Sequence, residues 1–202
     1  MPVVLVPSER LRRWLENFES RHGATSLSVV AGRMVGLAED GSTFEAVAPF
    51  GRAVAEPTVE ALTEAATPPD DWGILLVRKG GFAVARLAGQ RIVDSKVGQR
   101  HVQGRTKAGG QSQQRFARRR DNQARAAYEA AADHAARLVA GVPMLVTGGD
   151  HAAVVAVLAD SRLRGAGDRV VADFLAVADP RRSVLEAAIA DACSVRMSVT
   201  NA

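Results

Sequence analysis

Residues 72–98 read WGILLVRKGGFAVARLAGQRIVDSKVG, and they set the architecture that the sequence predicts. The stretch divides into three β-rich runs, WGILLVRK, GFAVARLAG and QRIVDSKVG. Gly80 and Gly81 are expected to form the turn between the first two runs, because glycine adopts the backbone angles of tight hairpins. The three runs therefore predict a β-meander.

Helices and further strands follow the meander. A long helix is expected over about residues 112–140, a buried strand at VPMLVTGG, and a helix over about residues 150–163. A further apolar run, RVVADFLAV, precedes a helix over residues 180–192 and a last strand, CSVRMSV. This order predicts an α/β fold, a mixed β-sheet flanked by helices.

The first part of the chain predicts a small α+β extension. SERLRRWLENFESRHG spaces its apolar residues at helical intervals, with Ser8 as the expected N-cap and Gly23 as the stop. TSLSVVAG and TFEAVAPF alternate like strands, and AEPTVEALTEAATPPDD predicts a short helix closed by Pro68 and Pro69. We therefore expect residues 1–70 to pack on a main domain of residues 71–202.

The composition excludes several classes of protein. Cys193 is the single cysteine, which rules out an internal disulfide framework. The first apolar run is too short for a signal peptide, and no apolar stretch approaches the roughly 20 residues that span a bilayer. A cytoplasmic protein without a membrane role is expected. The four histidines, His22, His101, His134 and His151, show no metal-site spacing, so neither a metal nor another cofactor is expected.

Positive charge is concentrated in one segment of the chain. Residues 96–125 hold nine Lys or Arg and a single acid, Asp121, so this segment carries +8. The formal net charge of +4 leaves −4 for the remaining residues. Such a distribution favours a polyanionic partner such as RNA, although a run of like charges can also be a solvated surface.

The centre of the basic segment, residues 104–122, reads GRTKAGGQSQQRFARRRDN. His, Asp, Glu and Cys are the usual side chains at catalytic sites, and none of them lies between His101 and Asp121. Gly109 and Gly110 allow close approach of the backbone to another surface, and amides near a helix start can stabilise developing negative charge. Gln111 can orient a water molecule without changing its protonation state.

The helix that follows this loop predicts one apolar and one basic face. On a helical wheel, one side carries Phe116, Ala117, Ala124, Ala127, Tyr128, Ala131, Ala135 and Leu138. The other side carries Arg115, Arg118, Arg119 and Arg125, while Arg120 falls within the apolar arc. One face is expected to pack on the sheet and the other to present guanidinium groups.

The segment GGQSQQRFARRR closely resembles the GGQ segment of the central domain of eukaryotic and archaeal class I peptide release factors. There, Gly-Gly-Gln-Ser precedes an Arg-Phe-Ala-Arg run at the same spacing, which is far more specific than a bare GGQ. The similarity continues in order from the preceding strands through VPMLVTGGD, over roughly residues 71–192. The chain as a whole resembles the actinobacterial branch of the Vms-like release factors, peptidyl-tRNA hydrolases that work in ribosome rescue.

The resemblance implies an RNase H-like release-factor central domain that hydrolyses the ester between nascent chain and tRNA. Carried over by position, Gly109 and Gly110 shape the catalytic loop and Gln111 is the catalytic glutamine, with Gln113 as the alternative. The implied partners are ribosomal RNA at the peptidyl transferase centre of the large subunit and peptidyl-tRNA, not DNA. The residues expected to bind RNA are Arg105, Lys107, Arg115, Arg118, Arg119 and Arg125.

The segment that precedes the release-factor-like region is short, which argues against stop-codon reading. Full release factors carry a decoding domain ahead of the GGQ domain, whereas about 70 residues precede it here, without an Asn-Ile-Lys-Ser motif. Codon-independent rescue of peptidyl-tRNA on stalled large subunits is therefore expected. The alternative is a non-catalytic ribosome- or RNA-binding module that uses the same basic helix.

The stretch TGGDHA, residues 147–152, has two interpretations. It could bind phosphate, but it lacks the Gly-Lys-Ser/Thr of a P-loop. A strand end followed by Asp150 as a helix N-cap explains it more simply.

Overall fold

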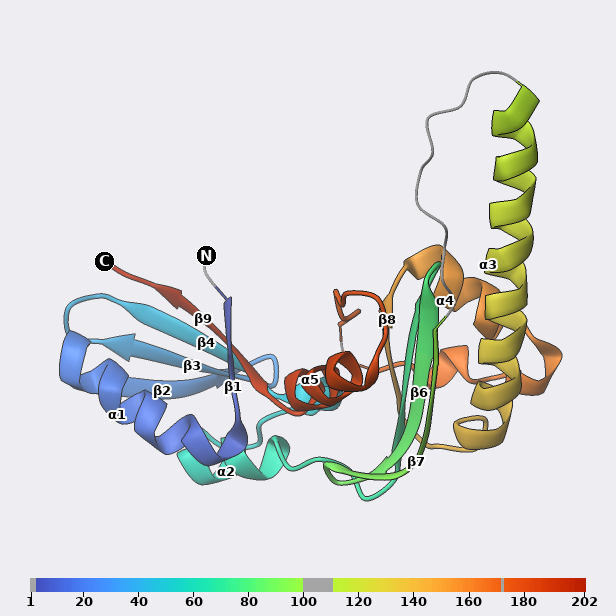
Figure 1. Ribbon diagram of the computed structural model, residues 1–202. Helices are drawn as coiled ribbons and strands as arrows, with labels where there is room; N and C mark the ends of the chain where they lie inside the picture. The colour runs from blue at the N-terminus through green and yellow to red at the C-terminus, as the bar shows by residue number, and fades with distance from the viewer. Residues whose placement is uncertain (1–2, 100–110, 172) are drawn as a thin grey trace. The chain divides into compact units, whose positions relative to one another are not determined.

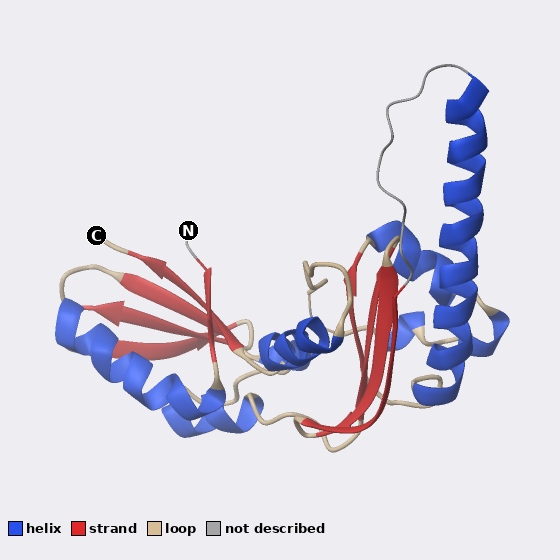
Figure 2. Cartoon of the chain, viewed as in Figure 1, coloured by secondary structure: helices blue, strands red, loops and turns tan. Residues whose placement is uncertain are grey.

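The computed structural model describes the backbone of residues 3–99, 111–171 and 173–202, and their side chains except those of residues 99 and 111–124. The chain forms two compact units, residues Met1–Pro69 with Ile189–Ala202 and residues Asp70–Ala188. Each unit contains one β-sheet with helices (Figure 2). The predicted mixed α/β class is confirmed. Among the described residues, no helix is long and apolar enough to cross a membrane.

The sheet of the second unit is built on the predicted meander. Its strands are β5 (Trp72–Arg78), β6 (Gly81–Ala88), β7 (Arg91–Gln99) and β8 (Leu145–Gly149), in the order β7-β6-β5-β8. β5, β6 and β7 are antiparallel, and β8 joins β5 in parallel. The apolar run RVVADFLAV adds only two parallel bridges beyond β8, at Val170 and Leu175. The antiparallel meander and the parallel strand together form the predicted mixed sheet.

The first hairpin differs slightly from the prediction. Gly81 already pairs with Arg78 in the ladder, so the turn consists of Lys79 and Gly80. The error is one residue, because either glycine of the pair fits a tight turn.

Helices α3 (Gln111–Leu138) and α4 (His151–Leu158) pack on this sheet, followed by short 3-10 turns η3 (Ser161–Leu163) and η4 (Gly167–Arg169). A further helix, α5 (Arg182–Ala192), contains the boundary between the two units, after Ala188. Residues of α3, α4, β5 and β6 share one hydrophobic core. The helix predicted over residues 150–163 ends at Leu158, because the Asp160 carboxylate caps the separate turn η3 through the Arg162 N–H.

The sheet of the first unit is entirely antiparallel. Its strands are β1 (Val3–Val6), β2 (Thr25–Val30), β3 (Arg33–Ala38), β4 (Thr43–Val47) and β9 (Val195–Thr200), in the order β1-β9-β4-β3-β2. Two 3-10 turns, η1 (Ser8–Arg10) and η2 (Pro49–Gly51), and two helices, α1 (Leu11–His22) and α2 (Val59–Ala65), complete the unit. The aromatic rings of Trp14, Phe18 and Phe44 pack together in its core.

Two expectations for this unit need correction. The main domain expected to run to residue 202 loses its last segment, because β9 lies between β1 and β4 in the first sheet. Ser8 is not the N-cap of α1, because it lies inside η1 and Arg10 occupies the cap position without a side-chain hydrogen bond. Gly23 does end α1, with φ of 91°.

Candidate functional site

In the sequence, the predicted catalytic and RNA-binding residues fall just before α3 and along it as far as Arg125. Gly109, Gly110, Arg105 and Lys107 fall outside the described residues. α3 begins at Gln111, and its first turns include Gln113, Arg115, Arg118 and Arg119, whose side chains are also outside the description. Arg125 is described and exposed, as the wheel predicted.

The position of Gln111 has a chemical consequence. The first four N–H groups of an α-helix have no acceptor within the helix, and the helix dipole places partial positive charge at this end. Gln111 is the first residue of α3, so its N–H belongs to that set. The GGQ sequence therefore ends at a helix terminus whose first N–H groups have no acceptor within the helix.

α3 is long enough to carry this end away from the sheet. Its 28 residues correspond to about 42 Å at 1.5 Å per residue. In Figure 1 the later half of α3 lies along the sheet, and the earlier half extends beyond the ends of β6 and β7. The described residues of α3 that enter the core start at Ala127. The sheet thus holds α3 by its later half.

The buried face of α3 consists mostly of alanine side chains and packs closely on the sheet. Ala131 and Ala135 are fully buried, and Leu138 is 6% exposed, as predicted for the apolar side of the wheel. Directly after the helix, Val139 lies so close to Gly73 of β5 that a Cβ on Gly73 would stand 2.7 Å from its Cγ1. A glycine in the buried strand therefore lets the end of α3 approach the sheet.

Arg169 holds the carboxyl end of α3. Its Nη2 donates to the carbonyl oxygen of Ala140 at 2.6 Å, and its Nη1 donates to that of Val142 at 2.9 Å. Its Nε donates to the carbonyl oxygen of Gly165 at 3.1 Å. The guanidinium places positive charge next to the negative end of the helix dipole and bonds the two carbonyls just beyond it.

A second arginine contacts the side of α3. Arg162 lies 2.8 Å from the carboxylates of both Asp133, on α3, and Asp160. Hydrogen bonds from Arg162 lower the pKa of Asp160 to about 2. Neither arginine was identified in the sequence, because each lies at least 27 residues from its partners on α3 or just after it, and no local pattern relates them.

His134 of α3 packs against the sheet. Its ring stacks on Phe82 of β6 with the centroids 5.7 Å apart. Burial, followed by the positive charges of Arg137 and Lys96, lowers the pKa of His134. The imidazole therefore favours its neutral form and serves packing.

The TGGDHA stretch forms the predicted strand end and N-cap. The Asp150 carboxylate accepts hydrogen bonds from the N–H groups of Ala152 and Ala153 at 3.0 and 3.4 Å. The ring of His151 stacks on Phe174 at 3.6 Å. The Asp150 carboxylate and the His151 ring are therefore both engaged in contacts within the fold. In the described part of the chain, no group of three His, Cys, Asp or Glu residues could hold a metal ion.

The chain is similar to two archaeal proteins of known structure. Among solved structures, archaeal translation termination factor aRF1 is similar at 12% identity with a TM-score of 0.44, over 94% of this chain and 63% of that one. A second archaeal protein is similar at 12% identity with a TM-score of 0.35, over 94% of this chain and 65% of its own length. This chain thus spans less than two thirds of either protein. No curated protein matches.

A family model gives a stronger result than these structures. The model of the Actinobacteria/chloroflexi VLRF1 release factor matches residues 70–198, which is more than half of the chain. The match contains the meander, α3 with the segment before it, and most of β9. The resemblance indicated by GGQSQQRFARRR is confirmed, and the chain belongs to the Actinobacteria/chloroflexi VLRF1 release factor family.

Proposed function

We propose that this protein hydrolyses peptidyl-tRNA on large ribosomal subunits and so releases stalled nascent chains without reading a codon. The family is one of release factors, which act in translation with ribosomes and tRNA. One observation carries the catalytic part of the proposal: α3 begins at Gln111, directly after Gly109 and Gly110 in the sequence. The GGQ sequence therefore ends at the first turn of a long helix, where the backbone N–H groups have no acceptor within the helix.

The proposed reaction is attack of water on the carbonyl carbon of the ester that joins peptide to tRNA. The bond from this carbon to the ribose oxygen breaks, the ribose oxygen gains a proton, and the peptide leaves as a carboxylate. Negative charge develops on the carbonyl oxygen, and a helix-terminal N–H is suited to stabilise it. In this proposal the Gln111 backbone amide has that role and its carboxamide orients the water. Ribosomal RNA and the terminal ribose supply the remaining groups.

The basic residues have a separate role in this proposal. Arg105, Lys107, Arg115, Arg118, Arg119 and Arg125 bind phosphates of ribosomal RNA and orient the loop. The exposed position of Arg125 on α3 is consistent with this role. The sheet holds the later half of α3. Contacts of the earlier half with RNA phosphates therefore determine where Gln111, the first residue of α3, is placed.

The test is single-turnover release of labelled peptide from peptidyl-tRNA on purified large subunits. We expect Gln111→Ala to slow release by about 100-fold, because it removes the carboxamide that orients the water while the backbone N–H of residue 111 remains. Binding to the subunits, measured by co-sedimentation, should stay within a few fold, because many phosphate contacts hold the protein.

One further variant and the unmodified protein interpret the result. Gln113→Ala is the matched control on the same helix and should release peptide at the normal rate. Retained release in Gln111→Ala with loss in Gln113→Ala would move the catalytic role to Gln113. Normal binding without any release by the unmodified protein would support the non-catalytic RNA-binding module instead.

A further inference from the structure

The first unit exposes an apolar edge strand. β1 is the terminal strand of its sheet, and β9 is its only strand partner among the described residues. Val3, Val4 and Leu5 are 54%, 48% and 42% exposed, whereas Val6 is buried. An edge strand presents unpaired backbone N–H and C=O groups, and proteins usually protect such edges with charge, proline or a covering segment. β1 consists only of valine and leucine.

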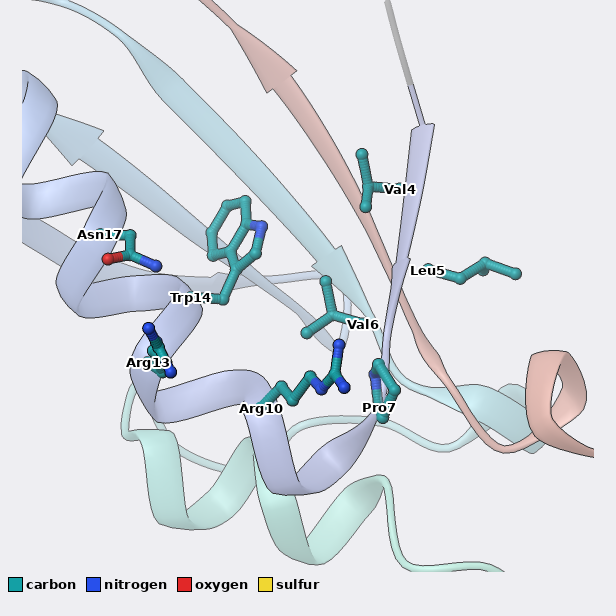
Figure 3. Close-up of a pocket in the computed structure, with 8 residues that line it drawn as sticks. All are labelled: Val4, Leu5, Val6, Pro7, Arg10, Arg13, Trp14 and Asn17. Atoms are coloured by element: carbon teal, nitrogen blue, oxygen red, sulfur yellow. The ribbon is translucent and has the colours of Figure 1, made fainter.

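A pocket opens beside this edge, between β1 and α1. Its volume is about 510 Å³, and it is lined by residues 4–7 together with Arg10, Arg13, Trp14 and Asn17. Figure 3 shows Val6 and Trp14 on the same side of β1 and Leu5 pointing to the other side. Trp14 is held by Phe18 and Phe44, with ring centroids 5.7 and 5.3 Å away. The pocket therefore has a fixed apolar wall that can accept an apolar side chain.

The rim of the pocket carries positive charge without compensation. Arg10 and Arg13 are both exposed, and within the part of the chain that the structure describes neither forms an ion pair. Arg12, on another side of α1, is paired with Glu60 at 2.6 Å. Two neighbouring free guanidinium groups beside an apolar pocket fit a ligand with carboxylates next to an apolar side chain.

We propose that β1 and this pocket bind an extended acidic segment of a partner protein, which adds to the sheet as a further strand. The backbone of the segment pairs with the free edge of β1. On the pocket side, one apolar side chain enters beside Trp14, and carboxylates two residues away along the added strand meet Arg10 and Arg13. Successive side chains of a strand point to opposite faces, so every second residue of the bound segment faces the pocket. Along that face, apolar and acidic residues must alternate.

The observations favour this ligand over two others. A nucleic acid could use the arginines and the tryptophan, but it has no peptide groups to pair with the edge of β1. A second copy of this chain pairing through β1 would bring two more arginines to the same edge, which like-charge repulsion opposes. An acidic extended peptide uses the edge, the pocket and the charge together.

The test uses a fluorescein-labelled peptide in which valine–threonine–glutamate–threonine is repeated twice. One face of this peptide alternates valine and glutamate, and the other is polar. Fluorescence anisotropy with the full chain should show saturable binding, and the same peptide with lysine in place of glutamate should bind at least about tenfold more weakly, equivalent to about 1.4 kcal/mol. Val4→Asp should abolish binding, because a carboxylate on β1 repels the glutamates of the peptide, and Arg10→Ala with Arg13→Ala should weaken it about tenfold.

Matched controls separate the site from general effects. Val30→Asp introduces the same charge on β2, the opposite edge of the same sheet, where Val30 is 57% exposed. Arg21→Ala removes an exposed arginine from the other end of α1. Both should bind like the unmodified protein, and circular dichroism should show that all variants remain folded.

Three outcomes would overturn the proposal. They are absence of saturable binding to the glutamate peptide, equal binding of the lysine peptide, and equal loss in Val4→Asp and Val30→Asp. Binding of single-stranded oligouridine that is lost in the Arg10→Ala, Arg13→Ala variant, without peptide binding, would assign the pocket to RNA instead. Peptide release on large subunits does not enter this test, so the two proposals fail independently.

Discussion

Gly149, at the end of β8, has a backbone that no other residue fits. Its φ is +105°, and a Cβ at this position would stand 2.2 Å from the carbonyl oxygen of Val77. That oxygen accepts the N–H of Asp150 at 2.8 Å, so it cannot move away without loss of a hydrogen bond. We expect Gly149→Ala to lower the free energy of unfolding by about 3 kcal/mol, from combined backbone strain and overpacking.

Urea unfolding followed by circular dichroism measures this change. The matched control is Gly141→Ala, because nothing lies within 4 Å of a Cβ there and its φ is not in the positive range. The control should change the free energy of unfolding by less than about 1 kcal/mol. Equal effects of the two substitutions would show that the close approach of β5 to Gly149 is not what constrains the residue.

At single positions the sequence predicted what depends on local chemistry. The Asp150 cap follows from an acid placed before a helix, and the structure confirms it. The requirement for glycine at position 149 could not be predicted, because it arises from Val77 on a strand distant in sequence. Ser8 misled the analysis because serine is favoured at caps, yet here the chain first makes a 3-10 turn.

Among the elements, α3 depends on contacts at its carboxyl end. Arg169 donates to three carbonyl oxygens through all its guanidinium nitrogens, a geometry that a lysine ammonium cannot reproduce. We expect Arg169→Lys to lower the free energy of unfolding by about 1 kcal/mol, because the part-buried carbonyl oxygens of Ala140 and Val142 lose hydrogen bonds. Hydrogen exchange should increase first in the last turn of α3.

The control for this substitution is Arg164→Lys, which changes an exposed arginine in the same loop. It should leave both unfolding and hydrogen exchange nearly unchanged. If Arg169→Lys behaves like this control, the three hydrogen bonds contribute little to the stability of α3.

The basic face of α3 gives a prediction about binding. If Arg118 and Arg119 contact ribosomal RNA phosphates, replacing both by alanine should weaken subunit binding. It should also lower the slope of log affinity against log salt by roughly one to two units, since each neutralised phosphate contributes about 0.7–0.9. Release at saturating protein should be largely retained.

Co-sedimentation with large subunits over a range of salt concentrations measures the slope. Arg137→Ala, an exposed arginine at the other end of α3, is the control and should keep the slope of the unmodified protein. An unchanged slope in the double variant would mean that this face is only solvated.

For α3 the sequence predicted both the element and its buried side. Helical periodicity placed Ala127, Ala131 and Ala135 on the core side, and all three are buried. The periodicity could not reveal Arg162 and Arg169, which come from later turns and meet the helix only through tertiary folding.

Across the molecule, the order of elements predicted the second sheet better than the first. The meander and the parallel strand follow from local runs with a helical crossover between them, which leaves few alternatives. β9 could not be assigned to the first sheet from sequence, because its pairing with β1 and β4 joins segments at opposite ends of the chain. β1 and β3 were missed, although β1 is entirely apolar and four of the six residues of β3 are apolar.

The proposed independence from the codon is a property of the whole protein and gives the last prediction. If the tRNA and the exposed face of the large subunit define the substrate, release should proceed on isolated large subunits at a rate independent of the tRNA's codon and amino acid. Intact ribosomes with an occupied A site should be poor substrates, because the GGQ loop must enter the centre that an A-site acceptor end fills.

The measurement compares release rates on split subunits, on intact ribosomes halted at a sense codon and on intact ribosomes halted at a stop codon. We expect the two intact samples to react equally and more slowly than the split subunits. The Gln111→Ala variant serves as the control for release that does not depend on the protein. Stimulation by the stop codon of about tenfold, equivalent to about 1.4 kcal/mol of transition-state stabilisation, would contradict codon independence. A codon-reading contact would then have to be sought in the first unit, since α3 and the loop before it are assigned to the peptidyl transferase centre.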